Sequence, residues 1–77
     1  MYQEKLKNLE AVRSDIGEDL FRRICASVIT EHYATAMRTR HSEVNKTMLH
    51  QLVNLHLREI GVEEVSYGFI RRVDRVC

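Results

Sequence analysis

The segment from Asn45 to Gly61 constrains the fold of this chain more than any other, because its apolar residues surround most of a helix. Its polar positions form a single stripe made of Thr47, Gln51, Asn54 and Arg58. A helix with so narrow a polar side packs against neighbours over most of its surface. Asn45 is a favourable N-cap, and Gly61 tolerates the left-handed backbone that closes a helix. The segment therefore predicts a central helix over residues 46–60.

Apolar residues at helical spacing predict three more helices, over residues 2–13, 16–38 and 62–76. Before the second of these, Asp15 and Glu18 have the spacing of a capping box. Its core side is expected to begin at Leu20 and to run to Ile29. Residues 38–43 are polar and contain no apolar anchor, which predicts a loop.

The last predicted helix is the least regular of the four. Gly68 and several β-branched valines lower its helix propensity, so a strand from Val65 to Ile70 is the alternative. The chain has no proline, three glycines and 30% charged residues, a composition typical of a helical domain. We therefore predict an all-α fold, a compact domain of three to four helices. Its core is expected to come from Leu20–Ile29, Met48–Ile60 and Val62–Val76.

The length of 77 residues limits the size of this core. Domains of this size commonly add disulfides, a metal or a partner chain for stability. Cys25 and Cys77 are too few for a disulfide framework, and no long apolar run or signal peptide indicates export or a membrane span. We expect a cytoplasmic protein that does not bind membranes, with Cys25 in the core and Cys77 as a terminal thiol.

Candidate catalytic and metal-binding residues do not form recognisable patterns. The four histidines are His32, His41, His50 and His56. No two of them lie four residues apart on one helix, and no cysteine is close in sequence, so we predict no metal site. No Ser/His/Asp grouping, Gly-rich phosphate loop or apolar pair of carboxylates is present, so we predict no catalytic residues and no cofactor.

The apolar surface of the central helix exceeds what two short neighbouring helices can cover. We therefore predict a homodimer. Its interface is expected to include Leu52, Leu55, His56 or Phe69. On this basis the chain is predicted to be a small regulatory or adaptor protein that binds other proteins through a helical surface.

DNA binding is the alternative function. The corner from Leu57 to Val62 resembles a helix-turn-helix, with a buried helix, a turn containing glycine and a second helix. The residues that would then face DNA are Ser66, Tyr67, Arg71, Arg72 and Arg75, with Arg38 or Arg40 beside them. The net charge of only +1 means that such binding requires a local basic patch.

Three departures from the helix-turn-helix pattern favour a plain helical hairpin. Leu57 occupies a position where these motifs usually have a small residue that lets the helices approach. Tyr67 and Gly68 replace the expected small aliphatic residue. Glu63 and Glu64 place negative charge at the end nearest the bases.

A second resemblance begins at Val44, Asn45 and Lys46, followed by apolar residues at Met48, Leu49, Leu52 and Val53. After a helix of the Leu20–Ile29 type, this arrangement resembles the small enterobacterial biofilm and acid-resistance regulators of the AriR type. The resemblance implies a short helical protein that dimerises through its helices and acts as a regulator or connector. It implies no catalytic residue.

Overall fold

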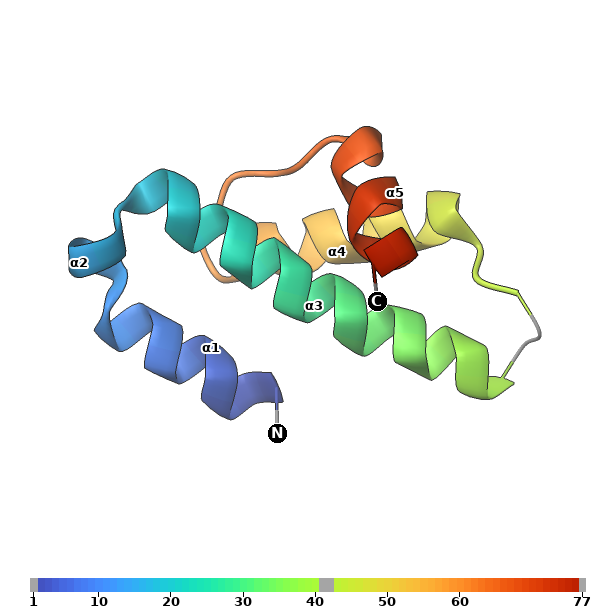
Figure 1. The fold of residues 1–77 in the computed structure, drawn as a ribbon, viewed down its shortest axis with the longest axis horizontal. Coiled ribbons are helices and arrows are strands. Elements are labelled where there is room, and N and C mark those ends of the chain that lie inside the picture. The colour runs from blue at the N-terminus through green and yellow to red at the C-terminus, as the bar shows by residue number, and fades with distance from the viewer. Residues whose placement is uncertain (1, 41–42, 77) are drawn as a thin grey trace.

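One helix, α3 (Glu18–Arg40), is 23 residues long and runs along the longest dimension of the molecule (Figure 1). The computed structural model describes residues 2–40 and 43–76, and of Arg75 and Val76 it describes the backbone alone. Within these residues the other elements are α1 (Tyr2–Ala11), α2 (Arg13–Ile16), α4 (Lys46–Glu59) and α5 (Tyr67–Val76). Each of them contacts α3. The predicted all-α fold is confirmed.

The core lies mainly between α3 and α4, and both helices contribute a buried stripe with four-residue spacing. The two stripes are Phe21, Cys25 and Ile29 on α3 and Leu49, Val53 and Leu57 on α4. Val62 and Ile70 complete this core from the C-terminal part of the chain. Thr30 is also buried, and its hydroxyl donates to the Ala26 carbonyl at 2.6 Å, so the polar atom is satisfied.

The N-terminal boundaries differ from the prediction. The helix expected over 2–13 ends at Ala11, and a separate turn, α2, follows it. The helix expected from residue 16 starts at Glu18, because Gly17 takes a left-handed φ of 87° between α2 and α3. The capping box of Asp15 and Glu18 is wrong, since the Glu18 carboxylate instead accepts from the Arg13 guanidinium at 2.7 Å.

The C-terminal part of α3 also differs from the prediction, because the helix continues through Arg40 into the expected loop. Two contacts accompany this extra turn. Arg38 forms an ion pair with Asp74 of α5, and the Thr39 hydroxyl donates to the Thr35 carbonyl at 2.9 Å. At the other end of α3, Leu20 is 47% exposed, so its assignment to the core is wrong.

The central helix agrees closely with the prediction. It begins at Lys46 and ends at Glu59, one residue before the expected end. The Asn45 side chain accepts from the Met48 amide at 3.1 Å, which is the expected N-cap. Gly61 has a φ of 76°, so the left-handed turn predicted at this position is present.

The final helix starts at Tyr67, five residues later than predicted, and the strand alternative is also wrong. Asn54 of α4 explains the non-helical segment before α5. Its Oδ1 accepts from the Val65 amide at 3.0 Å, and its Nδ2 donates to the Val65 carbonyl at 3.1 Å. The peptide groups of Val65 are therefore satisfied without a helix. Ser66 then caps α5 by accepting from the Phe69 amide at 3.2 Å.

Three helix ends meet at Asp74. Its side chain is only 7% exposed, and it forms an ion pair with Arg38 at the end of α3. The Lys46 ammonium at the start of α4 lies 4.0 Å from the other carboxylate oxygen. Because both cations are partly exposed, this cluster has the character of a half-buried ion pair.

We predict that Asp74→Asn lowers the free energy of unfolding by about 1–2 kcal/mol, because two cations lose their counter-charge. Chemical denaturation monitored by circular dichroism measures the change. Glu64→Gln is the matched control, since it breaks an exposed pair with Arg58 and is expected to change stability by less than about 0.5 kcal/mol. Equal effects of the two substitutions would contradict the prediction.

Candidate functional site

Three apolar side chains remain on the outer side of α4 after the core has formed. Met48, Leu52 and Leu55 are spaced four and three residues apart, so they lie on one line along the helix. Met48 is 51% exposed and Leu55 is 48% exposed, while Leu52 is half-buried between them. We call these three residues the α4 stripe.

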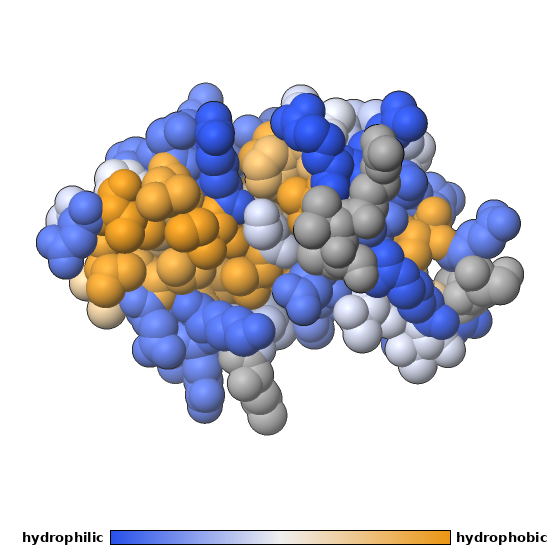
Figure 2. All heavy atoms as spheres, viewed as in Figure 1, coloured by the Kyte–Doolittle hydropathy of each residue, from blue (hydrophilic) through white to orange (hydrophobic). Residues whose placement is uncertain are grey.

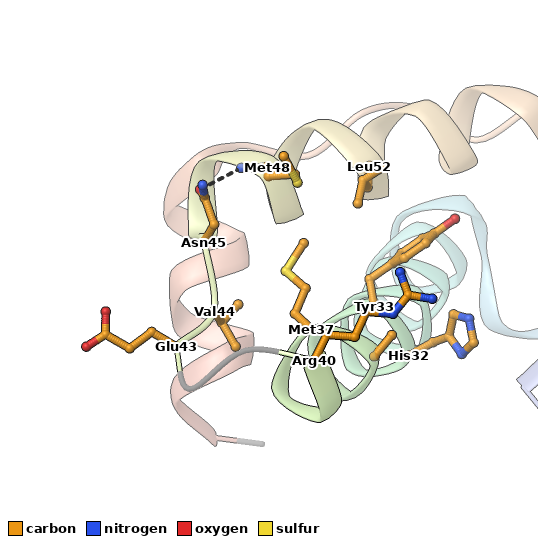
Figure 3. A pocket seen from close by; sticks show the side chains of 10 residues that line it. His32, Tyr33, Met37, Arg40, Glu43, Val44, Asn45, Met48 and Leu52 are labelled. Carbon is orange, nitrogen blue, oxygen red and sulfur yellow. Dashed lines mark hydrogen bonds between the residues drawn. The ribbon is translucent and has the colours of Figure 1, made fainter.

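A groove lies beside the α4 stripe, between α4 and the second half of α3. Its volume is about 810 Å³. The apolar side chains that line it are Tyr33, Ala36, Met37, Val44, Met48 and Leu52. Figure 3 shows Met37 directed from α3 towards Met48 and Leu52 of α4. The stripe and the groove share Met48 and Leu52, so they form one surface, which we call the α4 face.

The polar residues around the groove come from its ends. His32 and Arg40 belong to α3, whereas Glu43 and Asn45 precede α4. Glu43 points away from the groove in Figure 3, and Asn45 is occupied as the N-cap. No described carboxylate forms an ion pair with Arg40, which leaves an exposed cation at this end of the α4 face.

An aromatic cluster borders the other side of the groove. Tyr2 of α1 stacks on His32 with ring centroids 3.8 Å apart, and it meets His56 edge-on at 5.8 Å. The Tyr33 hydroxyl lies 3.4 Å from Nδ1 of His56. Burial raises the pKa of Tyr33, which further favours its protonated phenol. The cluster connects α1, α3 and α4 at the edge of the groove.

The predicted interface residues lie in different places. Leu52 lines the groove, Leu55 is exposed on the α4 stripe, and His56 is half-buried against Tyr33 of α3. Phe69 is half-buried against the core and lines a different depression, together with Arg22, Arg23 and Arg72. The structure therefore places Leu52 and Leu55 on the α4 face, His56 in the aromatic cluster and Phe69 elsewhere. Sequence analysis missed the contribution of α3, namely Tyr33, Ala36 and Met37.

A further apolar surface is present away from the α4 face. Figure 2 shows apolar side chains gathered over the first half of α3 and the place where α1 meets it. Val12, between α1 and α2, and Leu20, in the first turn of α3, are exposed large apolar residues.

The arginines proposed to contact DNA have different surroundings. Arg38 is engaged by Asp74, and Arg40 lies at the end of the groove. Arg71 and Arg72 are exposed on α5, and no described carboxylate forms an ion pair with either. The Arg75 side chain lies outside the described part of the structure.

The connection between α4 and α5 is longer than the turn of a helix-turn-helix. Residues 60–66 separate the two helices. The turn in such motifs has about three or four residues. The predicted corner from Leu57 to Val62 therefore does not lead directly into the second helix, because residues 62–66 are not helical.

The described histidines make local contacts. His50 Nε2 lies 2.9 Å from both the Val65 carbonyl and the Asn54 side-chain nitrogen, so it supports the segment before α5. His41 lies outside the described residues, as does Cys77. Over residues 2–40 and 43–76, no group of three or more His, Cys, Asp or Glu side chains is arranged to hold a metal ion.

Comparisons with known proteins give no family assignment: no protein-family model, curated protein or solved structure matches this chain. The resemblance to AriR-type regulators stays a prediction. In the described part of the chain, no helix combines the length and apolar character needed to cross a membrane.

Cys25 is buried in the core, and burial raises the pKa of its thiol. A raised pKa lowers the fraction of reactive thiolate at neutral pH. We predict that, in a Cys77→Ser variant, Cys25 reacts with a thiol reagent at least about 100-fold more slowly in the folded protein than in denaturant. Absorbance of the released thiolate measures the rate. Comparable rates in the two states would show that Cys25 is accessible.

Proposed function

We propose that this chain is a non-enzymatic regulatory or adaptor protein that binds proteins through the α4 face and forms a homodimer there. The main support for this proposal is the exposure of Met48 and Leu55 beside a groove lined by apolar side chains. Exposed apolar residues that are contiguous with a groove are typical of protein-binding surfaces. The buried thiol of Cys25 is compatible with a reducing, cytoplasmic setting.

Two properties of the α4 face support binding of a helix rather than of a small polar ligand. The groove runs between two helices, and amphipathic helices bind in grooves of this kind through apolar residues on one side. Met37 and Met48 provide unbranched, polarisable side chains that adapt to the shape of a partner. The proposed similarity to AriR-type regulators agrees with a role as a dimeric connector.

The chain offers a matched pair of substitutions that tests this proposal. Leu55 on the α4 stripe and Leu20 on α3 are both helical leucines, with exposures of 48% and 47%. We predict that Leu55→Glu weakens self-association at least about tenfold, because it places a charge in an apolar interface. Leu20→Glu is expected to leave self-association unchanged. Sedimentation equilibrium over micromolar concentrations measures both.

Circular dichroism of the two variants verifies that they keep the helical fold. A wild-type chain that is monomeric throughout, with a melting temperature independent of concentration, would contradict the homodimer. A larger loss for Leu20→Glu than for Leu55→Glu would move the interface to the other apolar surface.

Duplex DNA binding by α5 is the second candidate function, and the exposure of Arg71 and Arg72 without carboxylate partners among the described residues favours it. We predict that Arg71→Ala and Arg72→Ala each remove one phosphate contact. Each is therefore expected to reduce the slope of the logarithm of the binding constant against the logarithm of salt concentration by about 0.9. Fluorescence anisotropy with a labelled duplex at several salt concentrations measures the slope. Arg58→Ala is the control, because Arg58 is exposed but paired with Glu64. Binding that is absent or insensitive to salt would exclude this function.

A further inference from the structure

We propose that the α4 face binds a second copy of this chain with the two α4 helices antiparallel, about a two-fold axis that passes near Leu52. This inference rests on the proposed homodimer and adds its partner geometry. It specifies which residues of the two subunits meet, and each of these contacts can be tested separately from dimerisation itself.

The α4 face has the shape that a two-fold interface requires. In such an interface the same surface is used by both subunits, so it must contain both a projection and a depression that receives it. The α4 stripe is the projection, because Met48 and Leu55 are the exposed large apolar residues of this helix. The groove between α3 and α4 is the depression beside it. A helix with apolar residues at i, i+4 and i+7 fits such a groove, and α4 itself has this pattern.

The charges at the two ends of α4 favour the antiparallel arrangement. Lys46 starts the helix, and Arg40 lies at the same end of the α4 face. Glu59 ends the helix and is exposed. Antiparallel packing brings each Glu59 towards the cationic end and the positive helix terminus of the other subunit. Parallel packing would bring like charges together instead.

Glu43 is the described charge near this end that opposes the arrangement, since it is also acidic. The Glu43 side chain points away from the groove (Figure 3). Its carboxylate is therefore directed away from a helix bound there. Asp74 already neutralises Lys46 in part, at 4.0 Å. Arg40 is therefore the main expected partner of Glu59.

The register follows from the position of the stripe. Leu52 is the central residue of the three and is near the middle of α4, so in an antiparallel pair it faces its own copy. Met48 then lies opposite Leu55 of the partner subunit. With a rise of about 1.5 Å per residue, the two copies of Met48 are displaced by about 12 Å along the helices and those of Leu55 by about 9 Å.

Disulfide crosslinking distinguishes this geometry, because a disulfide requires Cα atoms within about 7 Å. The substitutions are Leu52→Cys, Met48→Cys and Leu55→Cys, each made in a Cys77→Ser chain in which buried Cys25 is retained. We predict that Leu52→Cys crosslinks with itself under mild oxidation. Met48→Cys and Leu55→Cys alone should each give at least about tenfold less dimer, while their equimolar mixture crosslinks well.

The outcomes separate the geometry from the association. Efficient self-crosslinking at all three positions would indicate parallel helices and overturn the proposal. A dimer by sedimentation with no crosslinking at any position would place the interface elsewhere and overturn the proposal while leaving self-association intact. A monomer at all concentrations would overturn both this geometry and the homodimer.

A charge exchange provides a second measurement that does not depend on cysteine substitutions. Arg40→Glu and Glu59→Arg are each expected to weaken the dimer about three- to tenfold in low salt, and the double variant is expected to recover most of this loss. Sedimentation equilibrium measures the dissociation constants of the two single variants and the double variant, each compared with that of the wild type. Additive losses in the double variant would show that the two residues do not meet.

Discussion

The packing of α3 against α4 is the contact on which the rest of this structure depends. The buried stripes of the two helices, with Cys25 and Val53 at their centres, exclude water from the largest part of the core. The other helices, α1, α2 and α5, also pack on α3. A small domain thereby gains one shared core, although each of its shorter helices would be marginal alone.

Polar contacts then determine how the chain turns around this core. Asn54 projects from a largely apolar helix and satisfies both backbone groups of Val65, which holds the segment before α5 in a non-helical conformation. Asp74 joins the ends of α3 and α5 and approaches the start of α4. These contacts contribute orientation as well as stability, because buried polar groups require specific partners. The position of α5 follows from them.

Helix α4 has two roles that its amino-acid sequence combines on one element. Leu49, Val53 and Leu57 enter the core, whereas Met48 and Leu55 remain exposed on the other side. Met37 and Tyr33 of α3 extend the exposed side into a groove. The proposed protein-binding surface is therefore supported by the same helix pair that stabilises the fold. A partner on this surface would cover apolar area that the short chain leaves in water.

The sequence by itself determined the helical class and the central helix with its Asn45 cap, whereas the interface assigned to Leu52, Leu55 and His56 stays a prediction. These features depend on local periodicity and capping, which neighbouring residues encode. Only the tertiary structure decided that α5 starts at Tyr67, that α3 continues through Arg40 and that its side chains form half of the groove. The physical reason is that these outcomes depend on partners distant in sequence: Asn54 with Val65, and Arg38 with Asp74.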